Sequence, residues 1–225
     1  MKYRAWIARI VDRYRHLDDL RADWRDRRRE IERRLADFRR VGHGTDEELF
    51  PELAFCLFAI QTSARRSDDA VRALAANGLL WRGKPREVAA FLQRRVRFHN
   101  HKAAYLVAAR DRFLGGENAL RDWLNGSPPS ALRQRLVNEV DGFGYKEASH
   151  FLRNVGRGER FAILDRHILK NLRHHAVIRM IPGSLTAKHY VAIEGRVREF
   201  SRVVRIPIAA LDLVFWSRET GEVFK

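Results

Sequence analysis

Cysteine is almost absent from the sequence, which contains Cys56 alone, inside the apolar run LAFCLFAI. One thiol cannot form a disulfide within the chain, and it cannot hold a cysteine-ligated iron–sulfur cluster or zinc knuckle. Long apolar runs are missing too, since none approaches the ~18 to 20 residues that span a bilayer. The first twenty residues are interrupted by charge and lack the apolar centre of a signal peptide. We therefore expect a cytoplasmic protein without a membrane partner or an iron–sulfur cofactor.

Metal-binding spacings are also lacking, although the chain has 9 histidines. The run His99-Asn100-His101 spells the name of a nuclease motif but lacks the ββα context that the motif needs. His174 and His175 are adjacent, so they point in different directions on a helix, and no H-E-x-x-H pattern occurs. We expect no catalytic metal.

Acidic residues are outnumbered, with 28 Asp and Glu against 44 Lys and Arg, which gives a net charge of +16 and a pI of about 11.0. This balance favours a polyanionic partner, and nucleic acid before acidic lipid, so a nucleoid association is expected. Only 7 of the basic residues are lysines. Each lysine is therefore a candidate functional residue, because arginine can replace lysine on a surface but cannot act as a neutral amine nucleophile.

Strand-like alternation is scarce and helical periodicity dominates, so the sequence predicts an all-α fold of two helical lobes. Residues 49–60 are almost continuously apolar and predict a buried central helix. The run NGSPPS breaks the chain, and Ser130 can cap a helix over residues 131–139. Three segments are expected: an N-terminal helical segment, 1–48, that packs with the C-terminal lobe; a central lobe, 49–130; and a helix–hairpin–helix motif with the C-terminal lobe, 131–225.

The stretch NEVDGFGYKEASHFLRNVG, residues 138–156, places two glycines around an aromatic side chain, Gly142-Phe143-Gly144. Apolar helical stripes lie on both sides of it. Two antiparallel helices joined by so short a turn need positive φ and close backbone packing, which glycine supplies. The N–H groups of the turn and of the next helix then form an anion site suited to DNA phosphate. An ordinary helical hairpin is the alternative, and the charge of the chain favours DNA.

Lys146 stands in the first turn of the second of these helices, where the helix dipole disfavours a cation. Such a position favours a neutral amine nucleophile, and a simple phosphate contact is the alternative. Asp165 follows an apolar run in FAILDRHILKNL, 19 positions later. A carboxylate held by backbone N–H groups suits the stabilisation of positive charge on a sugar, although a plain N-cap is equally compatible with this pattern. Both residues could reach the same cleft.

Taken together, GFGYKEA and LDRH resemble the helix–hairpin–helix DNA glycosylases with a glycine/proline-rich loop and a catalytic aspartate (HhH-GPD superfamily). GFGYKEASHFLRNVG and the C-terminal LDLVFWSRETGEVFK resemble specifically the archaeal-type 8-oxoguanine DNA glycosylase/AP lyases. The resemblance covers about residues 45–225. One departure is Asp141, which stands where the family usually has proline before the first glycine, so the rigidity of the hairpin is in question.

The resemblance implies a base-excision-repair enzyme that acts as a monomer on double-stranded DNA containing 8-oxoguanine or abasic sites. Lys146 would attack C1′ of a flipped nucleoside and form a Schiff base, and β-elimination would nick the strand; Asp165 would stabilise the oxocarbenium-like sugar. The residues implied for substrate binding are Phe98, Asp212, Trp216 and Lys225. Those implied for DNA binding are Gln61, Gly142, Phe143, Gly144, Tyr145 and His167, and the backbone carbonyls of Asn138, Val140 and Phe143 are implied ligands of a monovalent cation.

Two other functions are compatible with parts of the pattern. A non-catalytic helix–hairpin–helix DNA-binding module explains the charge and the glycines, but leaves Lys146 and Asp165 unexplained as a pair. A glycosylase for oxidised pyrimidines, of the endonuclease III type, usually carries a four-cysteine cluster that this chain cannot form. The spacing from Trp216 to the C-terminal Lys225 favours the purine lesion.

Overall fold

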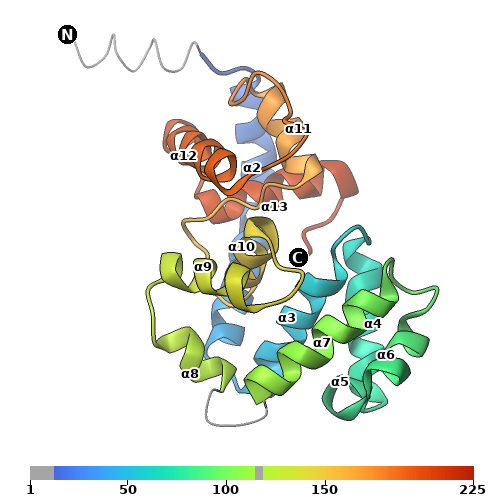
Figure 1. The fold of residues 1–225 in the computed structure, drawn as a ribbon. Helices are drawn as coiled ribbons and strands as arrows, with labels where there is room; N and C mark the ends of the chain where they lie inside the picture. The colour runs from blue at the N-terminus through green and yellow to red at the C-terminus, as the bar shows by residue number, and fades with distance from the viewer. Residues whose placement is uncertain (1–12, 115–118) are drawn as a thin grey trace. The chain divides into compact units, whose positions relative to one another are not determined.

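The computed structural model of the chain describes residues 13–114 and 119–225. Across these ranges the regular structure is entirely helical, which confirms the predicted fold class (Figure 1). None of the helices in the described ranges is both long and apolar enough to cross a membrane. The helices are α2 (Leu17–Gly42), α3 (Asp46–Phe58), α4 (Ala64–Ala76), α5 (Leu79–Arg82), α6 (Pro85–Leu92), α7 (His99–Leu114), α8 (Leu120–Asn125), α9 (Pro129–Glu139), α10 (Tyr145–Asn154), α11 (Arg166–His174), α12 (Ala187–Val204) and α13 (Ile208–Thr220).

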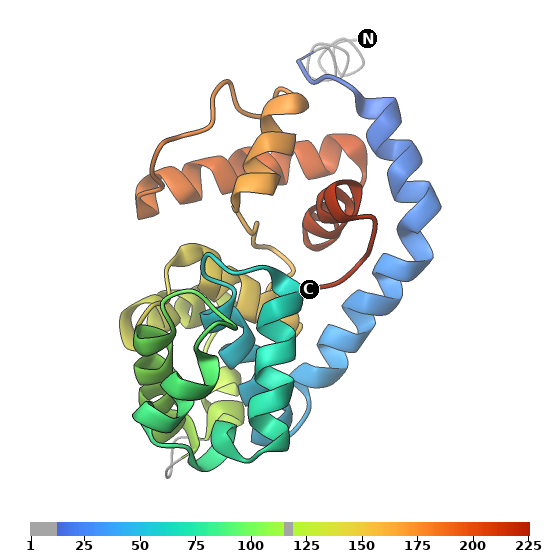
Figure 2. The ribbon, with the colours of Figure 1, turned by 90° about the vertical axis from the view of Figure 1, so that its right-hand side faces the viewer.

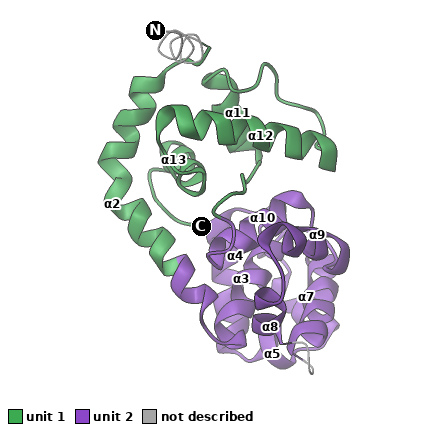
Figure 3. Cartoon of the chain, turned by 90° about the vertical axis from the view of Figure 1, so that its left-hand side faces the viewer, with its two compact units in different colours: residues 1–37, 159–225 green, residues 38–158 purple. Residues whose placement is uncertain are grey.

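The chain forms two compact units, which Figure 3 colours separately. Unit 1 contains residues 1–37 and 159–225, and unit 2 contains residues 38–158. The long helix α2 begins in unit 1 and ends in unit 2. The helical hairpin of α9 and α10 belongs to unit 2, together with helices α3 to α8.

Unit 2 is built around α3, which the sequence predicts as a buried central helix. Apart from Pro51, its apolar side chains from Leu49 to Phe58 are completely buried. Helices α4, α7, α8 and α10 pack against it (Figure 1). At its start the Glu48 carboxylate accepts a hydrogen bond from the Thr45 N–H at 3.0 Å, which is one half of the predicted capping box. The hairpin helix α10 therefore rests on the most apolar element of the chain.

The start of α9 differs from the sequence prediction. Pro128 is the N-cap residue and Pro129 is the first helical residue, so Ser130 lies inside the helix and does not cap it. The physical reason is that proline fits the first helical position well, since its fixed φ suits the helix and its missing N–H would have no intrahelical partner there.

Unit 1 consists of most of α2 with α11, α12 and α13, and Figure 2 shows α13 between α2 and α12. A buried extended segment, Phe161 to Leu164, precedes α11. Two side chains of α12 hold it: Tyr190 Oη donates to Ala162 O at 2.7 Å and accepts from Leu164 N at 3.1 Å, and Glu194 Oε1 accepts from Ala162 N at 3.0 Å. This segment fixes the backbone that leads to Asp165.

Candidate active site

The turn between α9 and α10 depends on Gly142. Its φ of 84° lies in the left-handed region, and a Cβ added to it would come 2.7 Å from Cδ2 of Tyr105 on α7. The turn closes by a hydrogen bond of 3.0 Å from Phe143 N to Val140 O. The buried Phe143 ring lies 6.5 Å from the ring of Phe151. Gly142 thus satisfies both requirements that the sequence pattern predicts, positive φ and close packing.

Gly144 does not share the role of Gly142. Its φ of −105° and ψ of −172° describe extended backbone that any residue adopts, so of these two glycines Gly142 supplies the positive φ that the turn needs. Gly144 is the N-cap of α10, and its N–H donates to Glu147 Oε2 at 3.2 Å. Without a side chain at the N-cap, the other first-turn N–H groups of α10 have no side-chain cap, which is the arrangement that an anion site at a helix N-terminus needs.

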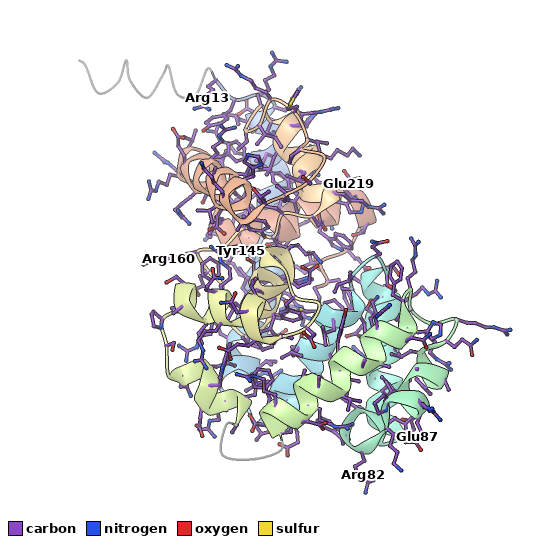
Figure 4. The ribbon with its side chains drawn as sticks, viewed as in Figure 1. Arg13, Arg82, Glu87, Tyr145, Arg160 and Glu219 are labelled. Carbon is purple, nitrogen blue, oxygen red and sulfur yellow. The ribbon has the colours of Figure 1, made fainter. Side chains whose placement is uncertain are left out.

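Lys146 is the second residue of α10, in the first turn as predicted. Its side chain is 22% exposed, and its Nζ lies 3.6 Å from Oε1 of Glu147. The adjacent Tyr145, labelled in Figure 4, donates from its hydroxyl to Gln134 Oε1 on α9 at 2.6 Å. The guanidinium of Arg133 lies 5.0 Å from the Tyr145 ring centre. Hydrogen bonds and ring contacts to α9 therefore fix the helix end that carries Lys146.

Cys56 is no competing nucleophile. It is completely buried in α3, and burial raises the pKa of its thiol far above the usual range, so it stays protonated. Helix α10, which carries Lys146, packs against α3.

Gln61 and Phe98 lie in two loops of the same unit. Gln61 is exposed in the turn between α3 and α4, with a φ of 52°, and it is not a helix-terminal residue. Phe98 immediately precedes α7, has a φ of 55°, and is 49% exposed. An exposed aromatic ring on a constrained loop is available for stacking on a base, whereas a core residue would be covered.

Asp165 is the N-cap of α11 and has extended backbone. Its Oδ1 accepts hydrogen bonds of 2.8 Å from both His167 N and Ile168 N. Among the described residues of unit 1, none donates a hydrogen bond to Oδ2 of Asp165. The carboxylate is therefore oriented through one oxygen and has a second oxygen available for chemistry, so capping and catalysis are compatible at this residue.

Of the predicted base-binding residues in unit 1, Trp216 contacts His167, two positions after Asp165. The ring of Trp216 on α13 meets that of His167 edge-on, with centres 5.3 Å apart. Asp212 is buried one helical turn before Trp216, on the same face of α13. His167 Nδ1 lies 3.9 Å from Oε2 of Glu219, which is labelled in Figure 4 near the end of α13. The structure thus brings Asp165, His167 and Trp216 together.

The C-terminal segment that carries Lys225 is anchored by arginines of α2. Arg27 Nη1 donates to Gly221 O at 3.1 Å, and Arg34 Nε donates to Phe224 O at 2.8 Å. The two arginines are seven positions apart and so lie on one face of the helix. This role of Arg27 and Arg34 leaves no signal in the sequence, because the bonds join residues 194 and 190 positions apart.

The predicted site residues divide between the two units. Lys146, Gln61, Phe98 and the hairpin belong to unit 2, whereas Asp165, His167, Asp212, Trp216 and Lys225 belong to unit 1. At the predicted cation site, Val140 O already accepts the Phe143 N–H, which leaves that oxygen one lone pair for an ion.

Comparison with known proteins gives a consistent result. Residues 31–206 match the model of the Ogg-HhH family, described as 8-oxoguanine DNA glycosylase. The chain is 42% identical to an 8-oxoguanine DNA glycosylase/AP lyase of Fusobacterium nucleatum, over 85% of this chain and 89% of that protein. It is 34% identical to the protein of the same name from Methanocaldococcus jannaschii, over 87% of this chain and 91% of that protein.

Solved structures agree with these sequence matches. The crystal structure of the 8-oxoguanine DNA glycosylase of Thermotoga maritima superimposes with a TM-score of 0.83 at 32% identity, covering 93% of this chain and 98% of that one. The Methanocaldococcus jannaschii 8-oxoguanine glycosylase/lyase, crystallised with a 15mer DNA containing 8-oxoguanine, gives a TM-score of 0.82 at 30% identity, covering 92% of this chain and 99% of that one.

Proposed function

The chain belongs to the Ogg-HhH family of 8-oxoguanine DNA glycosylases, and on that premise we propose how its own residues perform the reaction. The protein is a bifunctional DNA-repair enzyme, which excises 8-oxoguanine from DNA and cleaves the strand at the abasic site through a lysine Schiff base. The observation that supports the residue assignment best is the position of Lys146, in the first turn of α10 and directly after the Gly142–Gly144 turn.

Lys146 Nζ is the nucleophile in this proposal. The neutral amine attacks C1′ of the damaged nucleoside, the glycosidic bond breaks, and its electron pair leaves with the base. Opening of the sugar ring at C1′ then gives the Schiff base. Loss of a proton from C2′ breaks the C3′–O3′ bond, so the strand is cut on the 3′ side. The Glu147 carboxylate orients the protonated Lys146 side chain in the free enzyme, and the amine attacks once it has lost this proton.

Asp165 stabilises the positive charge that develops on the sugar as the base departs. Its Oδ1 is held by two backbone N–H groups, which keep the carboxylate oriented while Oδ2 interacts with the charge. A preorganised charge needs no rearrangement at the moment of reaction, and this is the physical reason for placing the carboxylate at an N-cap.

The remaining predicted residues bind DNA. The turn N–H group of Gly142 and the first-turn N–H groups of α10, which begins directly after Gly144, bind phosphate without reading sequence. Gln61 fills the gap that the flipped nucleotide leaves, and Phe98 and Trp216 stack on the flipped base, which Asp212 and Lys225 read by polar contacts. The other residues proposed to contact DNA are Phe143, Tyr145 and His167.

Two further assignments remain proposals. A monovalent cation at the carbonyl oxygens of Asn138, Val140 and Phe143 would add positive charge beside the phosphate. The relatives are bacterial and archaeal, and a repair enzyme of such cells works on nucleoid DNA, so we place the protein in the cytoplasm at the nucleoid.

A product assay tests this assignment. Duplex DNA with a single 8-oxoguanine is incubated with the enzyme under single-turnover conditions, and free base and cut strand are measured separately. Both products should form with the wild type, and neither should form with Lys146→Gln. Base release by Lys146→Gln at the wild-type rate would exclude Lys146 as the nucleophile. The variant Lys84→Gln, at an exposed lysine of the same unit, controls for the loss of one positive charge.

A further inference from the structure

Lys102 is a buried lysine to which the proposed reaction assigns no role. It lies on α7 and is 2% exposed. Its Nζ donates three hydrogen bonds: to Phe58 O at 2.7 Å, to Ile60 O at 2.7 Å and to Thr62 Oγ1 at 3.0 Å. An ammonium group has three donors, and all of them are used here. The acceptors all belong to the end of α3 and the loop that follows it, which is the loop of Gln61.

The same network extends to the loop of Phe98. Thr62 Oγ1, which accepts from Lys102 Nζ, also accepts from Arg97 N at 3.2 Å. In addition, the backbone N–H of Lys102 donates to Phe98 O at 3.0 Å. One residue of α7 therefore holds both loops, one through its side chain and the other through its backbone and Thr62.

Both loops have strained backbone. Among the described residues of unit 2, the non-glycine residues with positive φ are Gln61, Arg94 and Phe98, at 52°, 64° and 55°. Arg94 is also held by a hydrogen bond, since its carbonyl oxygen accepts from Arg66 Nη2 at 2.5 Å. Left-handed backbone in residues with a β-carbon persists only where surrounding bonds enforce it, and such residues gather at functional sites.

The Lys102 charge is costly where it stands. Burial, with smaller contributions from the nearby charges of Arg97 and Lys146, lowers the pKa of Lys102 to about 8. A neutral residue of similar length, such as methionine, would fill the space without this penalty. A merely structural residue would not need the charge, whereas a clamp for three acceptors does.

We propose that Lys102 is a positioning residue for base eversion, which holds the Gln61 and Phe98 loops in the strained shape that enters DNA. This inference rests on the proposed roles of Gln61 and Phe98. Lys102 does not touch the substrate, because its ammonium is buried and fully hydrogen-bonded. It acts through the two loops, and it is no rival of Lys146 for the Schiff base.

The test measures eversion apart from chemistry. In the Lys146→Gln background, fluorescence of 2-aminopurine next to 8-oxoguanine reports unstacking when the protein binds. Lys102→Met should lower this signal roughly tenfold relative to its parent, because the loops relax when the three donors are lost. Arg110→Met is the matched control. Arg110 lies eight positions later on α7, and its Nη1 donates to Gly83 O at 2.9 Å, so it also holds a carbonyl, in a loop to which we assign no DNA contact. The control should lower the signal less than about twofold.

A double-mutant cycle separates positioning from general destabilisation. With lysine present at position 146, Gln61→Ala should slow excision roughly fivefold in the wild type and less than about twofold in Lys102→Met, since the side chain is already misplaced there. In Arg110→Met it should slow excision as much as in the wild type. If Lys102→Met does not fold, Thr62→Val takes its place in both assays, because it removes the acceptor that the two loops share.

Three outcomes would overturn the inference. A folded Lys102→Met that unstacks 2-aminopurine as its parent does would show that the clamp is not needed. If the fold-reductions in excision rate caused by Lys102→Met and Gln61→Ala simply multiply in the double variant, Lys102 has a structural role only. Full excision by both Gln61→Ala and Phe98→Ala would remove the proposed role of the loops, and this inference with it. A failure of the nucleophile assignment is separate, because it would appear in the product assay and leave the fluorescence result unchanged.

Discussion

Glu147 links the proposed nucleophile to the turn before its helix. Its Oε1 lies 3.6 Å from Lys146 Nζ, and its Oε2 accepts the Gly144 N–H at 3.2 Å. The same carboxylate therefore fixes the first turn of α10 and orients the amine beside it. The phosphate grip and the reactive group are parts of one small structure, so a change in the turn is expected to alter both binding and catalysis.

Gly142→Ala should weaken both stability and DNA binding. A φ of 84° and a Cβ placed 2.7 Å from the Tyr105 ring lead us to expect a loss of about 1 to 3 kcal/mol of stability. Gly144→Ala is the matched control, because its φ is extended and the nearest atom to its Cβ is the movable Glu147 Oε2 at 3.3 Å. Urea denaturation and binding titrations on abasic-site duplex check this. Equal effects of the two substitutions would contradict the different roles of the glycines.

Asp165→Asn should separate capping from catalysis. Asparagine is as good an N-cap as aspartate, so the thermal midpoint should hardly change, while Asp165→Ala should lose about 1 kcal/mol. Excision by Asp165→Asn should nevertheless fall roughly 100-fold or more, because the charge opposite the developing cation is gone. The measurements are calorimetry and single-turnover excision. An Asp165→Asn enzyme with normal excision would reduce this residue to a cap.

Arg34→Met should lower selectivity for the lesion through Lys225. The bond from Arg34 Nε to Phe224 O anchors the segment, and its loss should reduce the ratio of 8-oxoguanine to guanine excision roughly three- to tenfold. Removing Lys225 from the Arg34→Met variant should then lower this excision ratio only slightly further. The control is Arg33→Met, at an exposed neighbour on the same helix. An unchanged excision ratio in Arg34→Met would show that the anchor does not position Lys225.

The stability of unit 1 should fall on acidification because of His175. The pKa of His175 is lowered to about 4, mainly by burial and also by the charges of Arg218, His174 and His16. The hydrogen bond to Arg15 O acts in the opposite direction and raises this pKa. Between pH 6.5 and about 4 the unfolded state binds more protons than the folded state, so stability decreases as the pH falls through this window. We expect on the order of 1 to 2 kcal/mol from this group. Urea midpoints of the wild type and His175→Gln at pH 7.5, 5.5 and 4.5 check it: the variant should show the flatter profile, and parallel profiles would contradict the assignment.

Local features of the structure could be predicted from the sequence, and distant ones could not. The hairpin, the place of Lys146 in the first turn of α10 and the N-cap at Asp165 all follow from a few neighbouring residues. The predicted Ser130 cap was wrong, because two prolines compete for the same helix start and proline suits the first position. The pattern predicts positive φ in the turn but does not show at which glycine, and the structure has it at Gly142 and not at Gly144.

The hydrogen bonds of Lys102 and Arg34 that hold the site could not be predicted from the sequence. Lys102 reads as one more basic residue in RFHNHKAAYL, and its acceptors lie 40 to 44 positions away. Arg34 lies in an arginine-rich stretch, residues 22–40, whose pattern favours a solvated helix face, although Arg34 anchors the C-terminal segment. Except for the Thr62 hydroxyl, the acceptors are backbone carbonyls, and every residue has a carbonyl, so the sequence does not indicate which residue is the partner.

Borohydride trapping on duplex DNA containing 8-oxoguanine tests the nucleophile assignment most directly. A Schiff base reduced in place leaves the protein covalently attached to DNA, and peptide mapping then identifies the lysine. The wild type should form this adduct at Lys146, and Lys146→Gln should form none while binding the duplex within a few-fold of the wild type. An adduct of undiminished yield in Lys146→Gln, or one mapped to Lys102, would contradict the mechanism.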